Sequence, residues 1–203
     1  PGHITEDFIN EWIGSLSGKS SSIENEIIVI RQFLEFLKYT GESVAIPSIP
    51  KVHDDYIPYL FSDTELNGIF ESADNIVQKD AKSDPYLVIE FPVILRLLYS
   101  CGLRIGETVK ISMNDVDLDD GILRLINTKG NKQRLVPMSP SMADILYKYC
   151  MAMNLIGSKN IWLFPSSKNK GHISARAVKY RFEHILHNNG IQVSNRKKYE
   201  RGP

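Results

Sequence analysis

Arg104 and Lys129 have the sequence surroundings expected of residues that act on a phosphate group. Arg104 follows the glycine of C-G-L-R and opens a predicted helix, where free backbone amides and the helix dipole favour an anion. A guanidinium group can donate to two phosphate oxygens at once. Glu107 lies one helical turn further on and can hold Arg104 in one rotamer. The alternative for Arg-x-x-Glu is an ordinary surface ion pair at a helix start.

The segment TKGNKQR places Lys129 at the tip of a predicted β-hairpin, where Gly130 permits the tight turn. A lysine at such a tip can reach into a groove and donate a proton to a leaving oxygen, which is general-acid catalysis. Lys132 and Arg134 follow closely and are expected to contact the same anionic ligand. The alternative is a solvated turn, because lysine is common in exposed loops.

These residues lie where the apolar period changes from that of a helix to that of a strand. Val116 and Leu118 alternate with aspartates, and the segments ILRLI and QRLVPM, separated by turns, are rich in β-forming residues. The sequence therefore predicts a mainly α fold with a small antiparallel three-stranded sheet. Helix starts are predicted at Thr5, at the capping boxes Ser21–Glu24 and Ser62–Glu65, at Asp84-Pro85, at Ser139-Pro140 and at Ser174.

A stretch at 47–60 that contains three prolines divides the sequence into two predicted domains. Residues 1–46 contain two predicted helices, which bury too little apolar surface to fold alone. We therefore expect these residues to be the end of a larger helical domain. Residues 61–203 contain the predicted sheet, the other helices and the candidate residues described above.

The formal net charge of the chain is zero, but the charges are unevenly distributed. Residues 1–120 hold 9 Lys/Arg and 21 Asp/Glu, a net charge of −12, whereas residues 121–203 hold 15 Lys/Arg and 3 Asp/Glu, a net charge of +12. Such a basic half suits a polyanion, and the alternative is that it packs against the acidic half. Further basic residues expected to contact a polyanion are Arg176, Lys179, Arg196, Lys197 and Lys198.

The sequence predicts neither a metal site nor a membrane segment. The run Asp-x-Asp-x-Asp at 115–119 imitates a calcium loop, but its glycine comes one position late and Ile126 replaces the closing glutamate. The histidines near the C-terminus lack further zinc ligands. The longest apolar run, at 27–30, is too short to cross a bilayer, and we expect no secretion signal. Cys101 and Cys150 are expected to be reduced thiols in a cytosolic setting.

Three motifs occur in the order C-G-L-R-x-G-E, V-D-L-D-D-G-x-L and T-K-G-N-K-x-R-L-V-P-M. In this combination they resemble the first half of the catalytic domain of tyrosine recombinases and phage integrases. The preceding helix pair and proline-containing linker resemble the end of the helical, SAM-like core-binding domain of that family. The resemblance therefore implies the end of a core-binding domain at 1–46 and an incomplete catalytic domain at 61–203.

The resemblance also implies an activity. Members of the family cut one DNA strand with a tyrosine, which forms a 3′-phosphotyrosyl link, and a free 5′-hydroxyl then attacks that link. No metal or nucleotide cofactor is consumed. Arg104 matches the first catalytic arginine, Glu107 the acidic residue beside it and Lys129 the lysine that protonates the 5′-oxygen. The implied partners are double-stranded DNA and, in the complete protein, further copies in a tetramer on DNA. The implied setting is the cytoplasm, in association with the nucleoid, for a protein of bacterial or phage origin. The implied substrate is the DNA of a mobile element or replicon.

The sequence departs from the family pattern near its C-terminus. The H-x-x-R box of the family is not found, and Tyr199 follows no such box. Tyr147, Tyr149 and Tyr180 fall on predicted helices before the box is expected. We therefore expect a chain truncated before its nucleophile and inactive by itself. The alternatives are a non-catalytic DNA-binding or regulatory relative and, less favoured by the small linker-joined domain, a relaxing topoisomerase.

Overall fold

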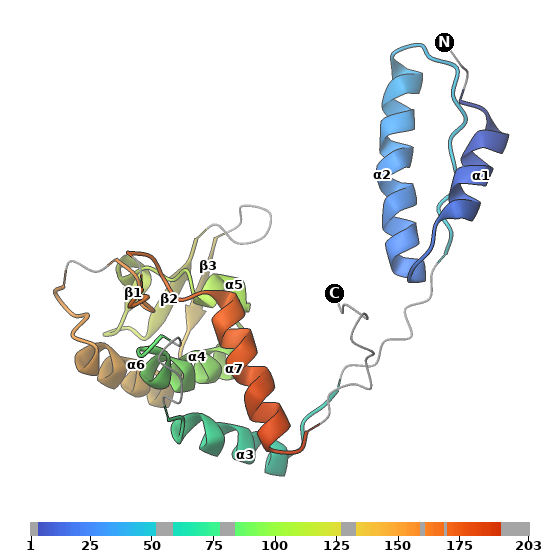
Figure 1. Ribbon diagram of the computed structural model, residues 1–203. Coiled ribbons are helices and arrows are strands. Elements are labelled where there is room, and N and C mark those ends of the chain that lie inside the picture. The colour runs from blue at the N-terminus through green and yellow to red at the C-terminus, as the bar shows by residue number, and fades with distance from the viewer. Residues whose placement is uncertain are drawn as a thin grey trace. The chain divides into compact units, whose positions relative to one another are not determined.

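The computed structural model describes residues 4–51, 59–77, 84–126, 133–158, 161–168 and 170–191 (Figure 1). The chain forms two compact units, Pro1–Pro58 and Tyr59–Pro203. The predicted fold class is confirmed, since the chain is mainly helical with one small antiparallel sheet. No helix in the described ranges is both long enough and apolar enough to span a membrane.

The first unit is built on a pair of helices. α1 (Glu6–Ser15) begins after Thr5, whose hydroxyl caps the helix as predicted. α2 (Ser20–Tyr39) follows after a short loop. The predicted start of α2 at a Ser21–Glu24 capping box is wrong, because Lys19 is the N-cap and no side chain caps this end. The assignment of this unit to a core-binding domain stays a prediction.

Three helices of the second unit begin at the serines that the sequence singles out. α3 (Asp63–Asp74) has the predicted capping box, in which Ser62 and Glu65 each bond to the other's backbone amide. Ser139 and Ser174 cap the two later long helices through hydrogen bonds from backbone amides. These helices are α6 (Pro140–Ala152) and α7 (Ala175–Asn188).

α4 (Leu87–Cys101) is the most buried helix of the second unit and starts later than the sequence predicts. Asp84 does not cap the helix, because one of its oxygens accepts from the Tyr86 amide in a turn that precedes α4. Its other oxygen accepts from the Ser166 hydroxyl and the Ser167 amide, far away in the sequence. Asp84 therefore joins the start of α4 to a distant loop.

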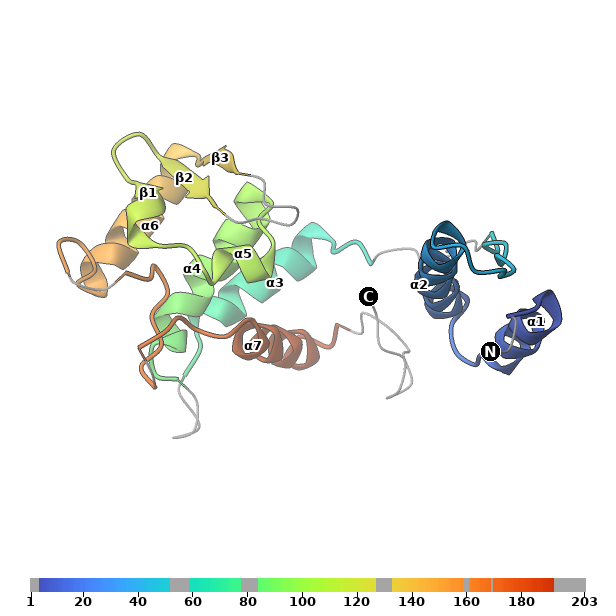
Figure 2. The same cartoon turned by 90° about the horizontal axis from the view of Figure 1, so that it is seen from above.

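A three-stranded antiparallel sheet follows α5 (Ile105–Thr108) and the 3₁₀ turn η1 (Met113–Asp115) (Figure 2). The strands are β1 (Val116–Asp117), β2 (Ile122–Leu125) and β3 (Arg134–Pro137), and their spatial order is β1-β2-β3. In the register of the second pair, Leu125 of β2 lies opposite Arg134 of β3.

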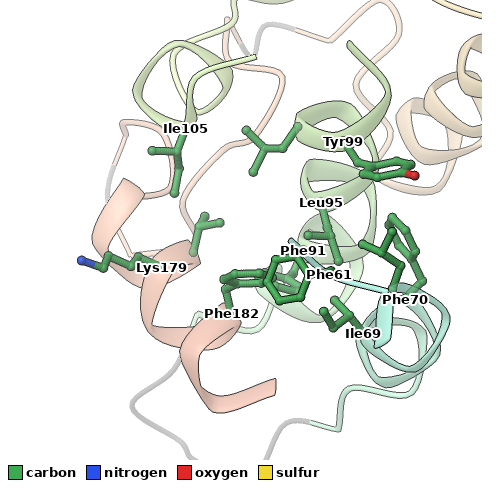
Figure 3. A pocket seen from close by; sticks show the side chains of 12 residues that line it. Phe61, Ile69, Phe70, Phe91, Leu95, Tyr99, Ile105, Lys179 and Phe182 are labelled. Atoms are coloured by element: carbon green, nitrogen blue, oxygen red, sulfur yellow. The ribbon is translucent and has the colours of Figure 1, made fainter. Parts of the chain in front are cut away.

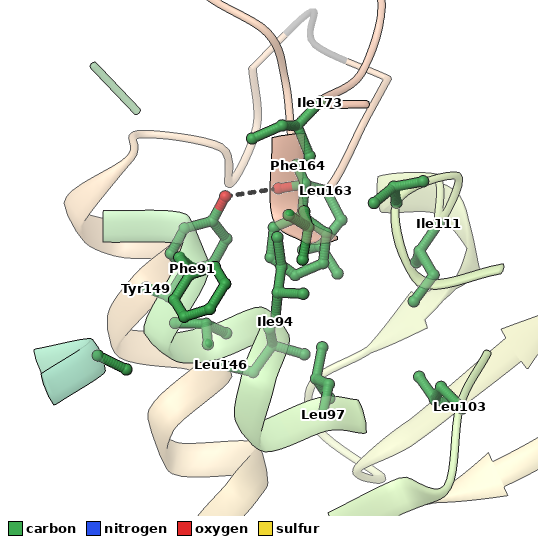
Figure 4. Packing of buried hydrophobic residues seen from close by; sticks show 14 of the residues in the cluster. Phe91, Ile94, Leu97, Leu103, Ile111, Leu146, Tyr149, Leu163, Phe164 and Ile173 are labelled. Carbon is green, nitrogen blue, oxygen red and sulfur yellow. Dashed lines mark hydrogen bonds between the residues drawn. The ribbon is translucent and has the colours of Figure 1, made fainter. Parts of the chain in front are cut away.

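The core of the second unit lies around α4, which contacts α3, α5 and α6. Ile94 and Leu97 of α4, Leu146 of α6 and Phe164 are all fully buried in this core (Figure 4). Segment 161–168 completes this core and pairs with the chain just after α5 through the backbone bond from the Leu163 amide to the Ile111 carbonyl. The short helix α5 thus packs against the long core helix and leads along the chain into η1 and the sheet.

Candidate active site

The backbone between α4 and α5 presents Arg104 to solvent. α4 ends at Gly102, which has the left-handed conformation (φ 60°, ψ 33°). The next residue, Leu103, is buried and anchors the turn in the core. Arg104 then takes an extended conformation as the N-cap of α5, and its side chain is 63% exposed. A buried leucine and a left-handed glycine thus aim the guanidinium outward at a helix start, as the sequence predicts.

Glu107 holds Arg104 at two places. Its Oε1 accepts a hydrogen bond from Arg104 Nη1 at 2.9 Å, and its Oε2 accepts from the Arg104 backbone amide at 3.2 Å. The buried Thr108 donates its hydroxyl to the Arg104 carbonyl at 3.0 Å. The side chain and both backbone polar groups of Arg104 are therefore engaged, which fixes the rotamer from which its remaining donors point outward.

Arg134 binds the same carboxylate from the sheet. Its Nη2 donates to Glu107 Oε2 at 2.9 Å and its Nη1 donates to Oε1 at 3.4 Å. The Glu107 side chain is only 11% exposed. The hydrogen bonds from Arg134, followed by those from the side chain and backbone of Arg104, lower the pKa of Glu107 to about 2 against the opposing effect of burial. Glu107 is therefore a carboxylate at every physiological pH.

Arg104 and Glu107 line a cleft that contains further basic residues which the sequence analysis missed. Lys110 and Arg124 are both exposed and both line it. Each had a local signal, because Lys110 lies one turn after Glu107 and Arg124 is the exposed position of the alternating strand β2. The other lining residues are Ile105, Gly106, Ile111, Ser112, Asp115, Leu125, Ile126 and Trp162.

Two of the predicted polyanion contacts lie on α7, away from the lining of this cleft. Arg176 is exposed on that helix. Lys179 is exposed as well, with its Nζ 3.8 Å from Glu183 Oε1. The remaining predicted residues, Lys129, Lys132, Arg196, Lys197 and Lys198, lie outside the described residues.

No tyrosine lines the cleft within the part of the chain that the structure describes. Tyr149 is buried on α6, and its hydroxyl donates to the Leu163 carbonyl at 2.8 Å. Burial, followed by the charges of Glu90 and Cys150, raises the pKa of Tyr149 above its usual value. Tyr147 and Tyr180 are exposed on α6 and α7, and Tyr199 lies outside the described residues.

A second concavity lies between α3, α4 and α7 and is almost wholly apolar (Figure 3). Phe91 and Leu95 of α4 face Phe182 of α7 across it, and Ile105 borders it at the start of α5. Lys179 stands at its edge with its ammonium turned away from the apolar side chains. No group of three or more His, Cys, Asp or Glu side chains in the described ranges is placed to hold a metal ion.

Comparison with known proteins gives consistent matches. The family model described as "Phage integrase family" matches residues 63–199. Tyrosine recombinase XerC of Staphylococcus carnosus is 26% identical over 182 residues, which cover 83% of this chain and 55% of that protein. Tyrosine recombinase XerD of Rhizobium meliloti is 26% identical over 195 residues, which cover 93% of this chain and 62% of that protein.

Among solved structures, the site-specific recombinase XerH bound to a palindromic difH substrate, in a post-cleavage complex, aligns with a TM-score of 0.71. The two sequences are 17% identical, and the alignment covers 95% of this chain and 55% of that one. At this identity the likeness shows a shared fold. The chain spans about half the length of the curated XerC relatives that it matches.

Proposed function

The chain belongs to the phage integrase family, and from this premise we propose that the whole protein is a site-specific DNA recombinase. It cleaves one strand of a DNA duplex with a tyrosine and rejoins that strand to a new partner. The observation that carries the proposal is the Arg104 guanidinium, held by Glu107 at the start of α5 and exposed in a cleft beside Lys110 and Arg124.

Arg104 stabilises the negative charge that develops on the scissile phosphate. Only its Nη1 and backbone amide are bound to Glu107 in the described part of the chain, so Nε and Nη2 remain to donate to phosphate oxygens. A donor that is already fixed needs no reorganisation when the charge appears, which is the main source of electrostatic catalysis. Glu107 supplies that fixation and stays negatively charged because its pKa is about 2.

The strand-transfer step conserves the phosphodiester bond energy. A tyrosine oxygen attacks phosphorus and forms a 3′-phosphotyrosyl link while the 5′-oxygen leaves. Lys129 is proposed to give its proton to that leaving oxygen. A free 5′-hydroxyl then attacks the phosphotyrosyl link and releases the tyrosine, so neither a metal nor a nucleotide cofactor is required. The nucleophile is not assigned to any residue of 1–203.

The proposed ligand is a DNA duplex, and the active assembly is a tetramer on two duplexes. The similar XerH chain was solved with its difH substrate. The positive half of the chain would lie along the phosphates, with the protein acting at the nucleoid of a bacterial cell on a mobile element or replicon. The residues proposed to contact DNA are Lys132, Arg176, Lys179, Arg196, Lys197 and Lys198. Arg134, which the sequence groups with them, instead has both terminal nitrogens bound to Glu107.

A second candidate function is DNA binding without cleavage, as in a regulatory relative. The observation in its favour is the basic lining of the cleft, in which Arg104, Lys110 and Arg124 can bind a phosphate without any covalent step. This candidate shares the DNA contacts of the first and lacks the covalent step, so a single assay separates the two.

The test is covalent capture of the full-length protein on a nicked suicide substrate, followed by denaturing electrophoresis. We expect a protein–DNA adduct that survives denaturation and that is absent for Arg104→Ala. A wild-type protein that binds duplex DNA but forms no adduct would establish the non-catalytic alternative. An Arg104→Ala protein that forms adduct at the wild-type rate would refute the role given to Arg104.

A further inference from the structure

Arg134 has both terminal nitrogens on one carboxylate, and this geometry differs from that of a free DNA contact. We propose that Arg134 positions Arg104 by acting through Glu107 and does not itself touch DNA. This proposal rests on the proposed function. Its role is to fix the plane of the Glu107 carboxylate, so that the carboxylate can fix Arg104.

The hydrogen bonds show how the fixation works. Each oxygen of Glu107 accepts one bond from Arg134 and one from Arg104. The two bonds from the Arg134 fork define a plane, which a single donor cannot do. Without Arg134, the Glu107 carboxylate keeps only the Arg104 donors and is free to rotate with them. Arg104 would then be bound to a carboxylate whose orientation is no longer fixed.

Burial places the three side chains in order from the inside to the outside. Glu107 is 11% exposed, Arg134 is 38% exposed and Arg104 is 63% exposed. An approaching phosphate therefore meets Arg104 before it meets Arg134. The exposed donors of Arg104, and not the committed donors of Arg134, are the ones available to a ligand.

Arg134 also stands on a rigid support. It is the first residue of β3 and lies opposite the buried Leu125 of β2 in an antiparallel pair. Glu107 lies in α5, directly after the core helix α4. The Arg134–Glu107 ion pair thus connects α5 to the start of β3, the strand that follows Lys129 in the sequence. The backbones of Glu107 and Arg134 are not hydrogen-bonded to each other, so the side chains make this connection.

A positioning role at residue 134 requires the planar guanidinium group of arginine and not only a positive charge. Glu107 is ionised, so the Arg104–Glu107–Arg134 group has a formal charge of +1, which leaves one net positive charge to meet a phosphate. Lysine at position 134 would preserve that charge but would replace two parallel donors by one compact ammonium. A positioning role therefore predicts that lysine fails, whereas a simple phosphate contact predicts that lysine succeeds.

The experiment measures two quantities in the full-length protein with Arg134→Lys and Arg134→Gln. These are the rate of suicide-substrate cleavage at saturating DNA, and the dissociation constant for the same duplex as a function of salt. We expect both variants to cleave about a hundred-fold more slowly, the loss typical of a misplaced catalytic group. The dissociation constant and its salt slope should stay at the wild-type values, because no phosphate contact is lost.

A double-mutant cycle supplies the readout that a purely structural role would not give. If Arg134 acts through Glu107, the variant Arg134→Gln/Glu107→Gln should be no slower than the slower single variant. Independent, multiplicative losses would overturn the proposal. So would weaker binding with a salt slope reduced by about 1 and an unchanged cleavage rate at saturation, which is the behaviour of a phosphate contact.

Arg96→Gln is the matched control, since Arg96 also donates from both terminal nitrogens to one carboxylate, that of Asp74 on α3, at 2.8 and 2.7 Å, and lies outside the site. It should cleave at the wild-type rate, and its thermal midpoint shows what the loss of such a pair costs the fold. The variant Arg104→Ala distinguishes a failure of the proposed function from a failure of the positioning role of Arg134. If that variant cleaves normally, the assignment of Arg104 fails; if it is inactive while Arg134→Lys is normal, only the positioning role fails.

Discussion

The hydroxyl of Tyr149 donates a 2.8 Å hydrogen bond to the backbone carbonyl of Leu163, and both residues are buried (Figure 4). This bond joins α6 to the segment whose backbone pairs with Ile111, just after α5. The ring of Tyr149 also packs against Phe164, with centroids 5.4 Å apart. The core behind the candidate site thus depends on Tyr149, a residue that the sequence analysis set aside as a possible nucleophile.

Tyr149→Phe should destabilise the protein by about 1–3 kcal/mol, because it leaves a buried carbonyl without its donor. Urea unfolding of the wild type and the variant measures the difference. Tyr147→Phe, on the exposed side of the same helix, is the control and should leave the unfolding midpoint unchanged. DNA affinity should be the same for all three proteins, and a loss of affinity in Tyr149→Phe alone would contradict a structural role.

Arg104→Ala and Lys129→Ala should each reduce strand cleavage by the full-length protein about a hundred- to thousand-fold, the usual cost of losing one fixed donor. Arg104→Lys should recover little, because an ammonium cannot bind two phosphate oxygens in the manner of the planar guanidinium. Single-turnover cleavage of a suicide substrate gives these rates. Near-normal rates for both alanine variants would mean that these two residues are not the catalytic pair.

Glu90 should make the stability of the protein fall as the pH rises. Its carboxylate oxygens are buried without a hydrogen-bond partner in the described residues. Burial, and after it the charge of Asp84, raises the pKa of Glu90 from 4.5 to about 8. The folded state therefore holds a proton that the unfolded state releases between these values. The stabilising contribution is complete below pH 4.5, declines by up to about 1.4 kcal/mol per pH unit and is lost above pH 8.

Glu90→Gln should remove this pH dependence, since a neutral amide has no proton to release. Urea unfolding at several values between pH 5 and pH 8 should show the variant gaining stability over the wild type as the pH rises. Glu71→Gln, on the exposed surface of α3, is the control and should follow the wild-type curve. Parallel curves for the wild type and Glu90→Gln would show that Glu90 is ionised in the folded state.

Binding of duplex DNA by residues 1–203 should be strongly salt-dependent. If the positive half neutralises about six to ten phosphates, affinity should fall roughly a thousand-fold or more between 50 and 200 mM salt. Arg176→Gln and Lys179→Gln should each lower the slope of log affinity against log salt by about 1 if their side chains contact phosphates. Fluorescence anisotropy with a labelled duplex gives the slopes, and a salt-insensitive complex would point to a different kind of ligand.

Local chemistry explains which parts of the fold could be predicted from the sequence. The caps at Thr5, Ser62, Ser139 and Ser174 depend on an oxygen and an amide three positions away, so a short window contains the whole interaction. The serine run near Ser21 offers several equivalent oxygens, and the helix begins ahead of the predicted box.

Interactions between distant residues could not be predicted in this way. Asp84 looked like a helix cap, but its second oxygen is bound by Ser166 and by the Ser167 amide, so the interaction is tertiary. The sequence paired Arg104 with Glu107 correctly, because they are one turn apart. It could not show that Arg134 reaches the same carboxylate, since that contact depends on the register of β3 against β2.

Gly102 sets a limit on how this protein can be diversified in the laboratory. Apart from its two chain neighbours, a Cβ atom at this position would meet no atom within 4 Å, so the surroundings leave room for a side chain. The left-handed backbone conformation does restrict the choice of residue, because it costs roughly 1–2 kcal/mol of stability for most residues and less for asparagine. In a saturation library, fitness at position 102 should therefore rank substitutions by backbone preference and not by volume, with asparagine above alanine and valine last. The left-handed turn that leads into the Leu103-Arg104 pair thus accounts for the glycine at position 102.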